Sequence, residues 1–400
     1  MSAIIHQIIY KLLSILMSIA MVLGIPFDGF KADDSNWNTN YKYVFVHGLS
    51  GWGSYDAVNN IMPYWGMMGG DLMEYLNDKG FDCYAASVAS SSSAWDRACE
   101  LYAQLTGTVV DYGKAHSEEC NHERYGADYT GRALIASFSE EEKINLLGHS
   151  FGGATVRMFA HIMENGSETE IAATDSAELS DFFKGGKGDW IYSVVALAAP
   201  HNGTSAYCIT TDDVPVEEKE TLFDCVKREI QNAMSNMIGS ATAEKDTEKA
   251  EWDSAAYDMY IDNALEMNKS IETLENTYYF SIPCSATVKN DNGTYSPVES
   301  KMEPLFVSSS KAMGAFVGET KGGYVIDESW QENDGLVNTI SAKAPSSSPA
   351  KDYDAENVEK GVWNIMPTYD GDHMSLQGGL TKVNDVKDLY VTVLSMINSL

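Results

Sequence analysis

The pattern Gly148-His149-Ser150-Phe151-Gly152 places one serine between two glycines. The apolar run 144–147 precedes it and a helical pattern follows. In this strand–turn–helix context, G-x-S-x-G is typical of a nucleophile elbow, a sharp turn that lifts the serine hydroxyl above the end of a sheet. We expect both glycines to be required, because a Cβ there would collide with the neighbouring strand or helix.

A serine hydroxyl needs an imidazole to accept its proton and a carboxylate to orient that imidazole. On this type of elbow the chain order is serine, acid, histidine. Three histidines follow Ser150, namely His161, His201 and His373. His161 lies about three helical turns from the serine, and His201 comes too early for an acid to precede it. His373, in an acidic glycine-containing loop before the last helix, is therefore the predicted base.

The acid has three candidates. Asp334 follows an expected strand and lies in an Asn-Asp-Gly turn that can present its carboxylate. Asp327 is weaker, and Asp372 is adjacent to His373 and cannot easily reach the far side of the ring. The residues alone favour Asp334 and leave the other two open.

A second glycine-rich loop, residues 47–53, follows the strand-like stretch 41–46. A loop of this kind supplies one backbone N–H of an oxyanion hole, and the residue after the serine supplies the other. This assigns the N–H groups of Leu49 and Phe151, each worth roughly 3 kcal/mol to the transition state. We expect both side chains to face the acyl chain, and His47 to pack beneath the loop as a structural residue.

Alternating strand and helix patterns predict an α/β-hydrolase fold, with a mostly parallel central sheet flanked by helices. The expected strands are 41–46, 81–88, 144–148, 190–199 and 278–283, and the expected helices are 71–80, 154–164 and 383–400.

The stretch 205–276 differs from the rest because it is acidic, rich in methionine and poor in strand formers. Apolar residues from Phe223 to Ile238 recur at helical spacing. Its position between two sheet strands predicts a helical lid, and an ordinary surface insertion is the alternative.

The chain has 27 Lys and Arg against 58 Asp and Glu, a formal charge of −31. This argues against nucleic-acid binding, which needs clustered cations. Residues 12–27 carry no charge and follow Lys11, which predicts a signal peptide over 1–32 with a poorly marked cleavage site. An uncleaved membrane anchor is the alternative. Either reading places the catalytic domain, 33–400, outside the cell.

The six cysteines include no C-x-x-C pair, so zinc held by cysteines is not expected. Cys208 and Cys225 bracket an acidic loop and could form a disulfide in an oxidising compartment. Free thiols are the alternative.

Over residues 41–375 the chain resembles the secreted zinc-containing lipases of the staphylococcal and Geobacillus group. The matching segments are 44–53 (VFVHGLSGWG), 95–105 (WDRACELYAQL), 110–113 (VDYG), 199–204 (APHNGT), 332–339 (ENDGLVNT), 361–364 (GVWN) and Asp372-His373. The resemblance implies a catalytic triad of Ser150, Asp334 and His373.

The resemblance further implies a structural zinc in a small extra region, 94–132, with Asp96, His116 and His122 as ligands. The fourth ligand is expected before residues 252–258, where this chain is shorter, and cannot be placed. The same family has a calcium site with a glutamate two residues after the catalytic histidine and a following Asp-Pro. Ser375 and residues 379–381 (GLT) replace these, so calcium is not predicted.

The sequence therefore predicts a secreted carboxyl-ester hydrolase that acts on a lipid or other ester through an acyl-enzyme, as a triacylglycerol lipase or carboxylesterase. The short insertion raises the alternative of soluble or polymeric esters, with transient contact at a lipid interface or a polymer surface. An acyltransferase or amidase on the same triad, and a non-catalytic surface-binding protein, are the remaining alternatives.

Overall fold

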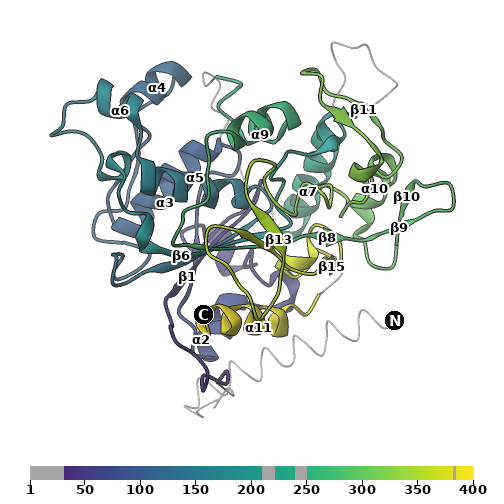
Figure 1. Cartoon of the computed structure of the whole chain (residues 1–400), viewed down its shortest axis with the longest axis horizontal. Coiled ribbons are helices and arrows are strands. Elements are labelled where there is room, and N and C mark those ends of the chain that lie inside the picture. Colours follow the sequence, from purple (N-terminus) through teal and green to yellow (C-terminus); the bar gives the residue numbers. More distant parts are fainter. Residues whose placement is uncertain (1–30, 210–220, 239–249, 382–383) are drawn as a thin grey trace.

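A computed structural model describes residues 31–209, 221–238, 250–381 and 384–400 (Figure 1). The predicted signal peptide lies outside these residues, apart from its last two positions. Within the described part of the chain, no helix is long and apolar enough to cross a membrane.

The centre of the molecule is a seven-stranded sheet in which every neighbouring pair is parallel. Strands without antiparallel neighbours must be covered on both faces. The order is β13-β14-β7-β6-β5-β1-β2. The bounds are β1 Lys42–Val46, β2 Cys83–Ala86, β5 Ile144–His149, β6 Ile191–Leu197, β7 Tyr278–Ile282, β13 Ala350–Asp352 and β14 Trp363–Ile365. The predicted fold class is confirmed.

Helices form a layer on each face of the sheet (Figure 1). They are α2 (Leu72–Asp78), α3 (Ala94–Thr106), α5 (Gly152–Asn165) and α11 (Lys387–Asn398). Side chains alternate across a strand, so Tyr43 and Phe45 pack in one core with residues of α2 and α11. Val44 and Val46 pack in the other core with residues of α3 and α5. This alternation packs β1 between the two cores.

The extra region contains β3 (Val109–Asp111), α4 (Lys114–Cys120) and β4 (Tyr125–Asp128), and α6 (Glu168–Ala173) contacts α4. The described part of the predicted insertion 205–276 contains the helices α7 (Leu222–Ile238), α8 (Ala255–Met259) and α9 (Ile261–Asn268). The apolar spacing that predicted a helix from Phe223 to Ile238 is thus confirmed.

Short elements complete the chain between β7 and β13. These are β8 (Cys284–Ser285), the hairpins β9 (Thr287–Lys289) with β10 (Tyr295–Pro297) and β11 (Gly318–Glu319) with β12 (Val325–Ile326), and α10 (Val307–Met313). Strand β8 pairs with β15 (Tyr369–Asp370), which follows β14. Within the described residues, no disulfide joins Cys208 to Cys225.

Candidate functional site

Ser150 lies in the turn between β5 and α5, with a left-handed φ of 56°. A Cβ on Gly148 would lie 2.3 Å from the carbonyl oxygen of Gly152. A Cβ on Gly152 would lie 2.3 Å from the carbonyl oxygen of Val46. Both distances are far below van der Waals contact, so the elbow needs glycine at both positions, as predicted.

The structure brings Ser150, His373 and Asp334 together from three distant parts of the chain. Ser150 Oγ lies 2.8 Å from His373 Nε2, and His373 Nδ1 lies 2.8 Å from Asp334 Oδ2. A carboxylate only accepts, so Nδ1 carries the proton and Nε2 is free to accept from the serine. The exposed fractions are 5%, 3% and 1%, which keeps water from competing for these bonds.

The carboxylate of Asp334 is held in place by its own turn. Its Oδ1 accepts hydrogen bonds from the N–H groups of Leu336 at 3.0 Å and Val337 at 2.7 Å. The N–H of His373 donates to the Asp334 carbonyl at 2.9 Å. Asp334 is therefore fixed in the orientation that leaves Oδ2 for the imidazole.

The other candidates lie elsewhere. Asp327 is exposed and caps a short helical turn through Ser329. Asp372 Oδ1 accepts from the Ser375 hydroxyl at 2.8 Å. His201 is buried against Trp363, with ring centroids 4.6 Å apart. The contacts thus separate Asp334 from the two aspartates that the sequence left open.

The N–H groups of Leu49 and Phe151 make no hydrogen bond to any described residue, so both can donate to an oxyanion. The side-chain prediction is confirmed for Leu49, which lines the pocket. It is wrong for Phe151, whose ring is fully buried. The guanidinium of Arg97 lies 5.1 Å from its centroid, which fixes the ring below the turn and away from the pocket.

Three hydrogen bonds through Tyr64 and His149 link the oxyanion loop to His373. The N–H of Gly48 donates to the Tyr64 hydroxyl at 3.0 Å, and that hydroxyl donates to His149 Nδ1 at 2.7 Å. His149 Nε2 then donates to the carbonyl of His373 at 2.8 Å. Burial, followed by the nearby His373, lowers the pKa of His149 to about 3, which keeps this ring neutral.

Sequence reasoning missed this role of His149 and Tyr64. The position of His149 beside the serine was the only signal, and nothing in the sequence links it to Tyr64. His47, by contrast, packs beneath its loop as predicted. Its Nε2 accepts from Val88 N–H and its Nδ1 donates to the Gly48 carbonyl, and burial lowers its pKa to about 3.

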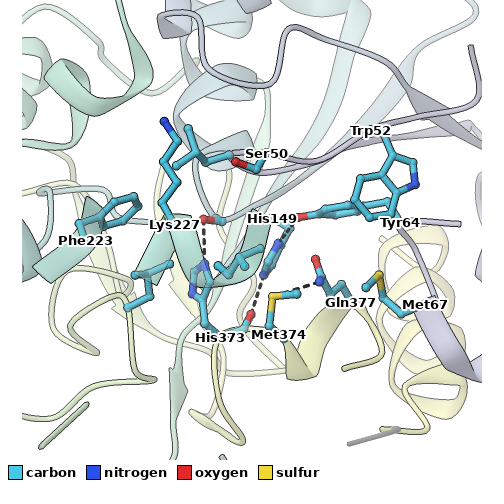
Figure 2. Close-up of a pocket in the computed structure, with 14 residues that line it drawn as sticks. Ser50, Trp52, Tyr64, Met67, His149, Phe223, Lys227, His373, Met374 and Gln377 are labelled. Carbon is cyan, nitrogen blue, oxygen red and sulfur yellow. Dashed lines mark hydrogen bonds between the residues drawn. The ribbon is translucent and has the colours of Figure 1, made fainter. Parts of the chain in front are cut away.

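A pocket opens above Ser150 (Figure 2). Its walls are mostly apolar, with Leu49, Trp52, Met67, Phe223, Ile230, Leu336 and Met374 among the lining residues. Helix α7 contributes Phe223, Lys227 and Ile230, which share one helical face. Among the described lining residues other than the histidines, Lys227 is the one cation.

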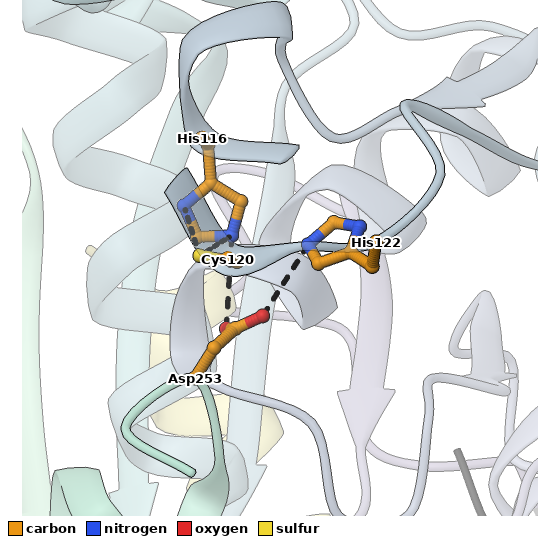
Figure 3. Close-up of side chains that lie close together, drawn as sticks. All are labelled: His116, Cys120, His122 and Asp253. Atoms are coloured by element: carbon orange, nitrogen blue, oxygen red, sulfur yellow. Dashed lines mark hydrogen bonds and ion pairs between the residues drawn. The ribbon is translucent and has the colours of Figure 1, made fainter. Parts of the chain in front are cut away.

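A second cluster lies at the extra region, where His116, His122 and Asp253 come together beside Cys120 (Figure 3). His116 Nε2 lies 3.1 Å from Asp96 Oδ1 and 3.6 Å from Asp253 Oδ1. His122 Nε2 lies 3.7 Å from Asp96 Oδ1 and 3.3 Å from Asp253 Oδ2. The three predicted ligands thus converge, and Asp253, which precedes α8, joins them as a fourth donor.

These donors fit a metal ion. His122 Nδ1 donates to the Glu123 carbonyl at 2.8 Å, so in the neutral ring Nε2 is an acceptor aimed at Asp253. Two acceptors in contact need a proton or a cation between them. Tetrahedral zinc with bonds of about 2.0 to 2.1 Å separates its nitrogen and oxygen ligands by about 3.3 Å, close to these distances.

Cys120 lies beside the cluster but fits it less well. Its Sγ is 3.6 Å from Nδ1 and 3.5 Å from Nε2 of His116. Because Sγ is almost equally far from both ring nitrogens, it lies beside the imidazole ring and not in front of the Nε2 lone pair, where a metal bound by Nε2 would be. The carboxylate of Asp96 therefore completes the set better than the thiol does.

The net charge of the cluster depends on whether it holds a proton or a metal ion. Burial lowers the affinity of His116 for a proton, but hydrogen bonds to Asp253 and Asp96 outweigh burial and raise its pKa to about 9. The metal-free cluster thus takes up a proton where a divalent cation would otherwise lie.

The family described as "Lipase-like, C-terminal domain" matches residues 39–390. The chain belongs to this lipase family. Lipase 1 of Staphylococcus aureus is 29% identical over 376 residues, covering 87% of this chain and 52% of that relative. The chain thus spans about half the length of the curated relatives it matches.

Solved structures support the same lipase assignment. EstA from Clostridium botulinum superposes with a TM-score of 0.75 at 31% identity, covering 94% of this chain and 92% of that one. Staphylococcus hyicus lipase superposes with a TM-score of 0.73 at 28% identity, covering 90% and 95%.

Proposed function

We propose that this protein is a secreted serine hydrolase that cleaves carboxylic esters. The observation that carries the proposal is the unbroken hydrogen-bonded series from Ser150 Oγ through His373 to Asp334, with both bonds at 2.8 Å. Membership of the lipase family supports the substrate class, and the uncharged segment 12–27 supports secretion.

In the proposed reaction, Ser150 Oγ attacks the ester carbonyl carbon while its proton moves to His373 Nε2. Asp334 stabilises the resulting imidazolium, and the N–H groups of Leu49 and Phe151 bind the oxyanion. Collapse of the tetrahedral intermediate breaks the carbon–oxygen ester bond, and the alcohol leaves with the proton from His373. Water, activated by the same imidazole, then hydrolyses the acyl-enzyme.

The pocket favours esters with an apolar acyl chain. Its walls are aliphatic and aromatic, and the face of α7 that carries Phe223 and Ile230 covers the serine. Apolar burial contributes roughly 0.8 kcal/mol per methylene. We propose that α7 and its insertion form a lid that must move before a long chain or a lipid surface reaches Ser150.

We further propose that Asp96, His116, His122 and Asp253 bind one zinc ion. Bound there, zinc would supply cross-linking between α3, the α4 region and the segment before α8, with no part in ester chemistry. The cluster would then hold the extra region and the lid segment to the same core.

Hydrolysis of p-nitrophenyl esters from acetate to palmitate, alongside emulsified triglyceride and a polyester film, tests this proposal. We expect turnover of the esters by wild-type protein and none above background by Ser150→Ala. A preference for emulsified triglyceride would identify a lipase, whereas a preference for short esters or the film would identify an esterase. Inactive wild type, or active Ser150→Ala, would contradict the proposal.

A further inference from the structure

The loop that carries His373 is rich in glycine. Residues 371–381, here called the His373 loop, contain Gly371, Gly378 and Gly379, and the last two have φ values of 115° and 78°. Glycine has the widest backbone freedom of any residue. A loop of this composition therefore needs contacts from outside to hold the imidazole at a fixed position.

Glu303 binds the C-terminal end of this loop through its side chain. Its Oε1 accepts hydrogen bonds from the N–H groups of Leu380 at 2.8 Å and Thr381 at 2.7 Å. Its Oε2 accepts from the Thr381 hydroxyl. The residue is only 1% exposed. Hydrogen bonds to a buried carboxylate are roughly twice as strong as neutral ones, so this contact is a firm one.

The backbone of Glu303 binds the other end of the same loop. Its N–H donates to Asp372 Oδ2, and Asp372 directly precedes His373. Asp372 Oδ1 in turn accepts from Met374 N–H at 3.1 Å and from the Ser375 hydroxyl at 2.8 Å. A single residue thus contacts the loop on both sides of the imidazole.

We propose that Glu303 is a positioning residue of the active site, which fixes the His373 loop so that Nε2 stays within hydrogen-bond distance of Ser150 Oγ. The inference rests on the proposed hydrolase function. Glu303 acts through the loop and touches none of the reacting atoms. An apolar side chain could fill its volume but would leave three donors at Leu380 and Thr381 without this acceptor.

The test compares Glu303→Gln and Thr381→Val with wild type at 25 °C. Gln keeps the shape but loses the charge and presents an amide N–H₂ to one of the donors. We expect kcat for p-nitrophenyl butyrate to fall about tenfold in Glu303→Gln and about threefold in Thr381→Val, with KM changed less than twofold. Glu328→Gln, at an exposed carboxylate in the helical turn Glu328–Trp330, is the control and should behave as wild type.

A fluorophosphonate supplies a second readout. Its rate of reaction with Ser150 depends on His373 as base, so this rate should fall in parallel with kcat. A purely structural role for Glu303 would lower the melting temperature and leave both rates at 25 °C unchanged, which would overturn the inference. If circular dichroism shows that Glu303→Gln is unfolded, unchanged kcat in Thr381→Val overturns it instead. Inactive wild type would refute the proposed function and this inference with it.

Discussion

Two clusters in this protein both combine imidazoles with carboxylates but favour different chemistry. The first, at the carboxyl ends of the sheet strands, joins one carboxylate, one imidazole and one hydroxyl in series. The second, in the extra region, sets two imidazoles against two carboxylates. In the first cluster, Nδ1 of His373 donates to a carboxylate and Nε2 accepts from a hydroxyl. In the second, each Nε2 faces two acceptors.

The comparison shows that the residue types in a cluster do not by themselves determine its chemistry. His373 can pass a proton because its acceptor nitrogen faces a hydroxyl, whereas the Nε2 atoms of His116 and His122 face the carboxylates of Asp96 and Asp253 and favour a bound cation. The groups around each imidazole determine whether it passes a proton or favours a cation. Neutral, buried His149 lies beside the first cluster, and the pKa of His116 rises to about 9 in the second.

The largest expected effect is a loss of activity that leaves the second cluster unchanged. Asp334→Asn should reduce kcat by about 10⁴-fold, because the amide favours the wrong tautomer of the base. Metal content and melting temperature should remain those of wild type. The measurement pairs ester kinetics with elemental analysis. A variant within tenfold of wild type would show that Asp334 does not orient His373.

Asp253→Asn should produce the reverse pattern. Removing one buried charge from a paired set costs roughly 3 to 5 kcal/mol, so we expect a lower melting temperature and loss of bound zinc. We expect kcat at 25 °C within about twofold of wild type. Thermal denaturation with and without a chelator checks this. Retention of one equivalent of zinc would exclude Asp253 as a ligand.

Acid should destabilise the fold through the neutral histidines near the first cluster. His47 and His149 have pKa values of about 3 in the folded protein, below the ordinary 6.5. Between these limits the unfolded chain binds protons that the folded chain does not. Stability is thus full above pH 6.5 and falls with acidification, by roughly 1.4 kcal/mol per pH unit for each histidine.

Urea unfolding at pH 7, 6, 5 and 4, in wild type and in His149→Gln, measures this slope. In His149→Gln, the pH slope of the unfolding free energy should be smaller by the contribution of one histidine. An identical pH dependence in both proteins would mean that His149 takes up a proton in the folded state.

Tyr64→Phe should have a smaller effect on catalysis. It removes the hydroxyl that accepts from Gly48 and donates to His149, leaving two buried groups without this partner. A lost buried hydrogen bond costs roughly 1 to 3 kcal/mol, so we expect kcat to fall about tenfold with intact metal binding. Steady-state kinetics checks this, and unchanged kcat would remove Tyr64 from the account.

The smallest effect concerns the lid. Lys227→Met replaces the one non-histidine cation among the described lining residues with an apolar side chain of similar length. About 30 Å² of added apolar contact is worth roughly 0.7 kcal/mol. The ratio of kcat/KM for palmitate over butyrate esters should rise about threefold. Lys321→Met, at an exposed turn, changes the net charge equally and should leave the ratio unaltered.

Local patterns predicted much of this molecule. The elbow at Ser150 and the helix that begins at Leu222 follow from residue spacing within one short stretch. Asp253 could not be assigned, because it reaches His116 across more than a hundred residues and only the folded chain brings them together. The ring of Phe151 was assigned to the pocket wrongly, since sequence fixes the position of a backbone N–H more closely than the direction of its side chain. His149 and Tyr64 carried no signal of their contact.

The most direct test of the central claim is intact-mass analysis after brief exposure to a fluorophosphonate. We predict one adduct per chain, located at Ser150 by peptide mapping, formed rapidly in wild type and in metal-free protein. Asp334→Asn should react at least a hundred times more slowly. An adduct on another residue, or equal rates in wild type and Asp334→Asn, would contradict the assignment of Ser150, His373 and Asp334 as the catalytic group.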